Sequence, residues 1–363
     1  MRITFLSPHL NLAGGVKNIL TFAKLLAERG HKINIVTQPP GKLNRTNLKL
    51  ALSYTQQTGF SLSRIIAKGV RLATPSMPIE WLENKASIYH VSNLEESLMP
   101  DADIIVCTGG SDGPIVNTYG PGKGRKFVFF QGFGANGVTR EEKAVAQMPF
   151  KKLVVASWIK KLLHDRFGED STLVRCSIDT NFFYPTTCNH EKIRTVGMLY
   201  HTAPWKGVTD GIKAFQIARQ HISKIKLVMF GCVGKPLLRF TRYCDFYYNP
   251  PQEFLRDIYS SCDVWVCPSR TEGFGMTSAE AMACKSCLVT TDNGGSRDFA
   301  FHNKTALVSP PQNVNQLADN IILALQNKSL RKRLASNGYD LIQTFTWEAA
   351  TDILEKTFTE ALH

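Results

Sequence analysis

The chain has 363 residues, of which 43% are hydrophobic, so it is long and apolar enough for two domains with separate cores. It has no apolar run long enough to span a bilayer, and its first residues lead straight into a predicted strand, so neither a membrane span nor a signal peptide is expected. The 9 cysteines are scattered, which argues against a disulfide framework and predicts a cytoplasmic protein with reduced thiols.

The net charge of +13 is unevenly distributed along the chain. Residues 1–185 carry 23 lysines and arginines against 14 acidic residues, with basic clusters at 64–71, 123–126, 151–152 and 160–161. This half would suit peripheral contact with anionic lipid at the inner face of a membrane, and an ordinary solvated basic surface explains it equally well. No nucleic-acid-binding signature accompanies the charge, so no nucleic-acid partner is expected.

The first half of the chain alternates predicted strands with helices. Strands are expected at 3–6, 33–37, 104–107, 127–130 and 153–156, and a helix at 16–29 has Ile19, Leu20, Ala23 and Leu26 on one face. Such alternation predicts a parallel sheet with right-handed crossovers.

A second series of the same kind begins near residue 194. Strands are expected at 195–199, 226–231, 263–267 and 286–291, with helices at 207–220 and 252–261 between them. The stretch 178–185, which contains polar residues and ends in Pro185, fits an interdomain connection. The sequence therefore predicts an α/β protein with two Rossmann-like domains, residues 1–183 and 184–345, followed by a helical segment at 346–363.

The stretch from Glu272 to Glu280, EGFGMTSAE, follows the predicted strand 263–267 and opens a helix. A strand–loop–helix junction in an open α/β sheet is a common ligand site, and the helix N-terminus suits a phosphate. We expect Glu272 in the loop and Glu280 in the first helical turn, where they could grip two polyol parts of a nucleotide sugar. An alternative is structural: Thr277 and Glu280 also fit a capping box.

This motif resembles that of the retaining glycosyltransferases of family four, whose mark is two glutamates separated by seven residues. The resemblance implies the GT-B fold, with two Rossmann-like domains facing a central cleft and a last helix that returns to the N-terminal domain. It also implies transfer of a hexose from a nucleoside diphosphate sugar, with UDP as the expected nucleotide. The acceptor would be a glycan or a lipid-linked molecule in polysaccharide or glycoconjugate synthesis, and the anomeric configuration would be retained.

Further site residues follow from this resemblance. Lys206 follows the strand 195–199 and opens a helix, as the family's phosphate-binding lysine does, whereas Gly197 and Met198 stand where relatives have Gly-Arg. Arg270 or His201 could replace the missing positive charge. The expected catalytic residues are Glu272, Lys206 and Gln131, and the expected donor-binding residues are Gly14, Gly15, Lys206, Arg270, Glu272, Gly273, Phe274, Gly275, Met276, Thr277 and Glu280.

Neither a cofactor nor a metal is expected. Asp101 and Asp103 imitate a metal-binding Asp-x-Asp motif, but they precede a predicted strand and so lie at the end of the sheet opposite to a ligand site. The glycines between Gly132 and Gly137 match a dinucleotide fingerprint without the acidic residue that should follow about 20 residues later. Two other functions remain open: a GT-B nucleotide-sugar epimerase or hydrolase, and a non-catalytic sugar-binding adaptor.

Overall fold

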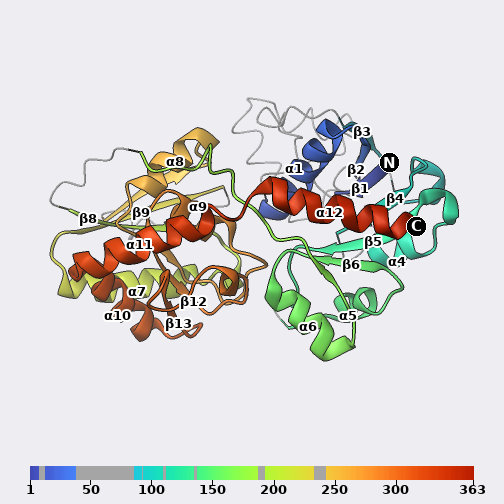
Figure 1. Ribbon diagram of the computed structural model, residues 1–363. Coiled ribbons are helices and arrows are strands. Elements are labelled where there is room, and N and C mark those ends of the chain that lie inside the picture. The colour runs from blue at the N-terminus through green and yellow to red at the C-terminus, as the bar shows by residue number, and fades with distance from the viewer. Residues whose placement is uncertain are drawn as a thin grey trace, which may run out of the picture. The chain divides into compact units, whose positions relative to one another are not determined.

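The computed structural model describes residues 1–7, 13–37, 86–91, 93–108, 112–134, 137–186, 193–232 and 243–363. The chain forms two compact units (Figure 1). The first unit comprises Met1–Phe130, Arg140–Leu153 and Thr351–His363, and the second comprises Gln131–Thr139 and Val154–Ala350. The segment Val154–Phe183, which the sequence assigned to the N-terminal domain, is thus grouped with the second unit.

A seven-stranded sheet has the strand order β3-β2-β1-β4-β5-β6-β7. Its central strands are parallel, and Phe5 of β1 lies between Ile35 of β2 and Val106 of β4. All three side chains are fully buried, which explains the continuous apolar runs in these strands. The bounds are β1 Arg2–Leu6, β2 Lys32–Thr37, β3 Ser87–His90, β4 Ile104–Cys107, β5 Arg125–Phe130, β6 Lys151–Val154 and β7 Thr172–Leu173.

Four α-helices of the described residues contribute to the first unit. The predicted apolar face of α1 is confirmed, because Ile19, Leu20, Ala23 and Leu26 are all buried. The last helix, α12, packs Phe358 edge-on against Phe127 of β5, with 5.0 Å between the ring centroids. The bounds are α1 Gly14–Glu28, α4 Asp112–Asn117, α5 Arg140–Ala146 and α12 Trp347–Leu362, with short 3-10 helices η1 Glu96–Leu98 and η2 Pro121–Lys123.

The second unit is built on a six-stranded sheet with the order β10-β9-β8-β11-β12-β13. Every neighbouring pair in this sheet is parallel. The two-domain, parallel α/β architecture predicted from the sequence is therefore confirmed. The strands are β8 Arg194–Leu199, β9 Ile225–Gly231, β10 Cys244–Tyr248, β11 Val264–Cys267, β12 Cys287–Thr291 and β13 Ala306–Ser309.

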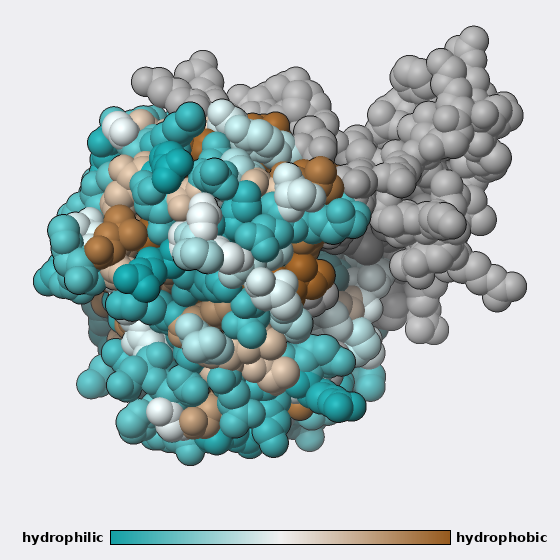
Figure 2. All heavy atoms as spheres, turned by 90° about the vertical axis from the view of Figure 1, so that its right-hand side faces the viewer, coloured by the Kyte–Doolittle hydropathy of each residue, from teal (hydrophilic) through white to brown (hydrophobic). Residues whose placement is uncertain are grey.

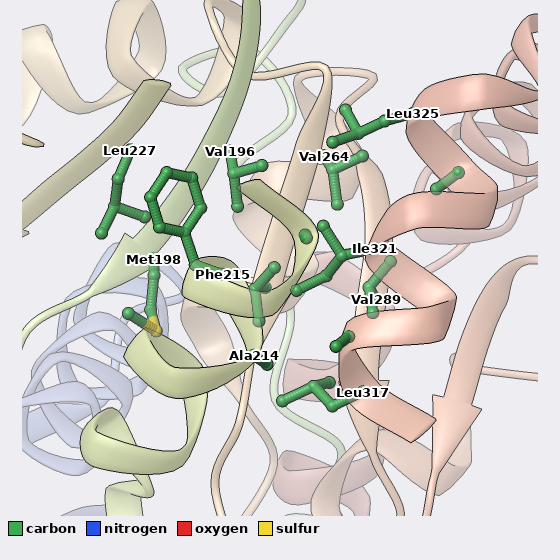
Figure 3. Close-up of a cluster of buried hydrophobic side chains, with 14 of the residues drawn as sticks. Val196, Met198, Ala214, Phe215, Leu227, Val264, Val289, Leu317, Ile321 and Leu325 are labelled. Carbon is green, nitrogen blue, oxygen red and sulfur yellow. The ribbon is translucent and has the colours of Figure 1, made fainter. Parts of the chain in front are cut away.

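Helices α7 and α10 form much of the core of the second unit with these strands. Figure 3 shows Ala214 and Phe215 of α7 and Leu317 and Ile321 of α10 meeting side chains from the sheet. Met198 of β8 belongs to this core and is only 1% exposed. The helices of this unit are α6 Ser157–Phe167, α7 Val208–His221, α8 Gln252–Ser260, α9 Met276–Ala283, α10 Val314–Gln326 and α11 Lys328–Ile342, with η3 Pro204–Lys206 and η5 Gly295–Asp298.

Candidate functional site

The candidate site lies where the strand order of the second sheet reverses. The chain runs from β8 outward through β9 and β10, and then returns to the other side of β8 with β11. In open α/β sheets, ligands bind outside the carboxyl ends of the strands at such a switch point. A pocket opens at this place, beside the last residues of β8 and β11, and is lined by Leu199, Lys206, Val266, Cys267, Pro268, Ser269, Glu272 and Thr277.

Lys206 and Glu272, which the sequence predicted as site residues, contact one another directly. The Lys206 ammonium donates to both carboxylate oxygens of Glu272 at 2.8 Å. Ser269, which the sequence analysis missed, donates its hydroxyl to Glu272 Oε1 at 2.6 Å. The lysine side chain is 23% exposed and the glutamate side chain 11%, so this pair is largely shielded from water.

Backbone contacts fix the places of both charged residues. Gly207, directly after Lys206, has φ +61°, and a Cβ there would come within 2.0 Å of the Pro268 carbonyl oxygen. Glu272 donates its N–H to the Asn293 carbonyl at 2.9 Å, which ties the motif loop to the segment after β12. Because the Pro268 backbone lies so close, only glycine can occupy position 207, which explains why Lys206 is followed by glycine.

The Gly-Phe-Gly turn is equally constrained. A Cβ on Gly273 would lie 1.9 Å from the Gln131 carbonyl oxygen, so the backbone of Gln131 packs directly behind the turn. The Trp158 indole, another residue that the sequence did not reveal, donates to the Gly273 carbonyl at 2.8 Å. Gln131 therefore lies beside the motif, with its backbone in contact with the turn.

The capping-box interpretation of Glu280 is wrong. Helix α9 begins at Met276 with Gly275 as its N-cap at φ +98°, and no side chain caps it. Thr277 is thus already inside the helix, and Glu280 is the fifth helical residue, beyond the predicted first turn. Glu280 is 5% exposed, and its Oε2 accepts a hydrogen bond of 2.8 Å from the Tyr259 hydroxyl.

The position that lacks the family's arginine, and the two residues that could replace its charge, have different surroundings. Met198 is buried in the apolar core, while its neighbour Leu199 lines the pocket, so an arginine at position 198 would not reach the pocket. Arg270 is paired with Asp210 of α7 at 3.2 Å. The pKa of His201 is lowered by burial and then by Lys206, and its Nδ1 accepts the Ala203 N–H, so the ring is neutral and can donate from Nε2.

Gly14 and Gly15 belong to the first unit, where they form the start of α1 after β1. β1 lies at the switch point of the seven-stranded sheet, between β2 and β4. The first-turn N–H groups of an α-helix have no partner within the helix, a feature that suits an anion. The residues 8–12 that precede them, like Ala135 and Asn136 of the second glycine-rich stretch, lie outside the described residues.

Asp101 and Asp103, which precede β4, form ion pairs. Asp103 accepts from Arg2 at 2.8 Å, and Asp101 accepts from Lys123 at 2.8 Å. These hydrogen bonds hold the pKa of both carboxyl groups below the ordinary value. Within the residues described, no three His, Cys, Asp or Glu side chains are grouped in a way that could hold a metal.

Several basic residues of the first unit have local structural partners. Lys126 donates to the carbonyls of Asn117 and Tyr119, and the buried Lys152 donates to those of Met148 and Phe150. The face of this unit in Figure 2 is mostly hydrophilic, with small separate hydrophobic areas. Among the helices that the structure describes, none has the length and apolar character needed to cross a bilayer. The basic cluster at 64–71 lies outside the described residues.

The sequence of residues 188–341 matches the family model for glycosyl transferases group 1. An uncharacterized glycosyltransferase of Methanocaldococcus jannaschii is 34% identical over 99 residues, which are 27% of this chain and 28% of that protein. A D-inositol 3-phosphate glycosyltransferase of Jonesia denitrificans is 35% identical over 88 residues, which are 24% of this chain and 21% of that protein. The matched stretch therefore spans less than a third of each of these relatives.

Solved structures are similar over nearly the whole chain. Anabaena HepE in complex with UDP and glucose has a TM-score of 0.75 at 14% identity, and the alignment covers 99% of this chain and all of that one. The sucrose-phosphate synthase of Thermosynechococcus elongatus has a TM-score of 0.72 at 16% identity, over 99% and 98% of the two chains. Because the sequence identities are this low, the similarity shows the fold alone, and this fold is that of GT-B glycosyltransferases. Residues 188–341, which lie within the second unit and contain the pocket, are similar in sequence to glycosyl transferases group 1.

Proposed function

We propose that this protein is a retaining glycosyltransferase that moves a hexose from a nucleoside diphosphate sugar to a glycan or lipid-linked acceptor. The observation that carries the proposal is the Lys206–Glu272 pair in a pocket at the switch point of the second sheet. The group 1 match over residues 188–341 supports it, since this stretch includes the pocket. UDP is the favoured nucleotide, because HepE and a TarM mutant, both similar in fold, were solved with UDP.

In this proposal the two charged residues have different tasks. Glycosyl transfer needs negative charge to be stabilised on the departing diphosphate, and a nearby ammonium and helix N-terminus can do this. Lys206 and the N–H groups of Met276 and Thr277 would take the diphosphate, while Glu272 would accept hydrogen bonds from sugar hydroxyls. Because Lys206 is held by Glu272 in this structure, donor binding would redistribute the lysine's hydrogen bonds between carboxylate and phosphate.

The remaining roles complete the proposed reaction. Glu280 would bind the ribose hydroxyls, and Gly14 and Gly15 would present backbone N–H groups to the diphosphate or the acceptor. The bond from the anomeric carbon to the diphosphate breaks as the bond to the acceptor oxygen forms on the same face. The acceptor proton then passes to the leaving phosphate oxygen, so no covalent sugar–enzyme intermediate is required. The reaction would need no divalent metal, and peripheral contact with an anionic membrane remains a prediction.

Nuclear magnetic resonance of nucleotide sugars tests the proposal. A thermal-shift screen first selects the donor, since a ligand at about 100 times its dissociation constant adds about 2.7 kcal/mol to stability. The selected donor should then persist with the protein alone and release nucleoside diphosphate when a mixture of glycan and lipid-linked acceptors is added, in the presence of EDTA. Conversion of the donor without an acceptor would identify an epimerase or hydrolase, and binding without turnover would identify an adaptor.

A further inference from the structure

The second glutamate of the motif has a dedicated partner. Glu280 is 5% exposed, and the hydroxyl of Tyr259, whose side chain is fully buried, donates to its Oε2 at 2.8 Å. Tyr259 comes from α8, so this bond joins two helices that follow different strands of the sheet. A buried carboxylate requires such donors, because leaving a charge without hydrogen bonds in a dry environment is costly.

Tyr259 is itself held in place on several sides. Its ring lies edge-on to Trp265, 4.7 Å between centroids, and to Phe230, 5.7 Å between centroids. The Phe183 ring also lies edge-on to it, with 6.0 Å between the centroids, and the Tyr259 carbonyl accepts a hydrogen bond from Ser286. The phenol therefore has little freedom to swing, and its hydroxyl fixes the orientation of the Glu280 carboxylate.

The phenol remains a donor under working conditions. Burial, followed by the nearby charge of Glu280, raises the pKa of Tyr259 well above its ordinary value, so the hydroxyl keeps its proton. A carboxylate can accept about four hydrogen bonds. Thr277, one turn before Glu280 on the same face of α9, lines the pocket.

We propose that Tyr259 is a positioning residue that holds the Glu280 carboxylate in the orientation that accepts the ribose hydroxyls of the nucleotide. The inference rests on the proposed function and adds the residue that would set selectivity for ribonucleotides over deoxyribonucleotides. A side chain that its neighbours hold in one orientation loses little conformational entropy when it binds hydroxyl groups. This favours a nucleotide whose ribose supplies those hydroxyls.

The test compares the affinities of UDP and 2′-deoxy-UDP by isothermal titration calorimetry. If UDP does not bind, ADP and GDP are each compared with their 2′-deoxy forms in the same way. Wild type should bind the ribonucleotide about 10-fold or more tightly than the deoxyribonucleotide, because a hydrogen bond to a charged group contributes about this much to affinity. Tyr259→Phe should reduce this preference to about threefold or less, because Glu280 can then turn away. If Tyr259→Phe unfolds, 4-fluorophenylalanine at position 259 fills the space of the hydroxyl and donates nothing.

Tyr119→Phe is the matched control, because Tyr119 is a buried tyrosine whose hydroxyl donates to the Leu94 carbonyl at 2.6 Å in the first unit. It should lower the melting temperature and leave the ribose preference unchanged. An unaltered preference in Tyr259→Phe, with a lower melting temperature alone, would overturn the inference and leave the proposed function standing. Absence of any nucleoside diphosphate binding in wild type would overturn both.

Discussion

At the scale of single residues, the pairing of Lys206 with Glu272 changes what each substitution should do. Glu272→Gln removes the charge that holds Lys206, so the ammonium becomes more available to a diphosphate. UDP should therefore bind this variant at least as tightly as wild type, while the transfer rate falls because the sugar loses a charged acceptor. Calorimetry with UDP and a transfer assay separate the two effects.

Glu280→Gln should behave differently, because the ribose is present in free UDP and in the whole donor alike. The loss of a charged hydrogen-bond acceptor should weaken UDP by about 10-fold or more. Equal weakening of UDP by Glu272→Gln and Glu280→Gln would refute the division of roles between the two glutamates.

The same pair should also contribute to stability. Among the described residues, Lys206→Ala leaves the Glu272 carboxylate, 11% exposed, with the Ser269 hydroxyl as a side-chain donor. This should lower the free energy of unfolding by about 1–3 kcal/mol. The double variant Lys206→Ala/Glu272→Ala should be little worse than Lys206→Ala alone, because no unpaired charge remains. Additive losses in melting temperature would show that the two residues act independently.

Single residues also mark how far the sequence could predict the site. Glu272 and Lys206 were found because their strand–loop–helix context and spacing are distinctive. Tyr259 and Trp158 were missed, since in a sequence a buried or half-buried aromatic residue is indistinguishable from ordinary core. The capping hypothesis failed because Gly275, with its positive φ, is the N-cap of α9, two residues before Thr277.

At the scale of elements, close backbone approaches hold the site together. Gly207 and Gly168 are both glycines with φ near +65° in the second unit, at +61° and +66°. A Cβ on Gly168 would meet nothing within 4 Å, whereas one on Gly207 would lie 2.0 Å from the Pro268 carbonyl oxygen. The two positions therefore separate the cost of a left-handed backbone from the cost of a clash at the pocket.

Gly168→Ala should cost about 1–2 kcal/mol of stability, the usual penalty for a side chain in this conformation, and leave UDP affinity intact. Gly207→Ala should cost more and also weaken UDP, since displacing Pro268 moves the pocket wall next to Lys206. Calorimetry and thermal unfolding of both variants measure this. Equal effects of the two substitutions on UDP affinity would contradict the assigned role of the Gly207–Pro268 contact.

Most helices and strands could be predicted from the sequence, but their first and last residues could be predicted less well. The central strands β1, β2, β4 and β5 were found because they are largely apolar, as buried parallel strands should be. β10 and β13 at the edges of their sheet were not assigned, because partly exposed or short strands carry a weaker pattern. The sequence did not show which side chains of β8 face the core: Met198 belongs to the core, whereas Leu199 lines the pocket.

At the scale of the whole molecule, the last helix is tied to the first unit by charge as well as by packing. Glu355 of α12 accepts hydrogen bonds from Arg29 at 2.7 Å and from His31 at 2.6 Å. The Arg29 bond, ahead of the His31 bond, holds the pKa of Glu355 below its ordinary value of 4.5. A carboxyl whose pKa is lowered by folding stabilises the fold above its unfolded pKa and loses that contribution as the pH falls through the folded value.

Glu355→Gln should therefore lower the stability at neutral pH by about 1 kcal/mol or less, and this penalty should shrink as the pH falls below the ordinary pKa of 4.5. Glu360→Gln in the same helix is the control, because Glu360 is 63% exposed and forms an i,i+4 pair with Lys356. Its effect should be small at every pH. A Glu355→Gln penalty that stays constant from neutral to acid pH would show that the contact does not act through charge.

The central claim for the molecule is that the pocket beside β8 and β11 binds the diphosphate of a nucleotide sugar through Lys206. The most direct test is calorimetric titration of UDP into wild type, Lys206→Ala and Lys213→Ala, the last an exposed lysine on α7. The account predicts at least about 10-fold weaker binding for Lys206→Ala and wild-type affinity for Lys213→Ala. Wild-type affinity in Lys206→Ala would contradict it.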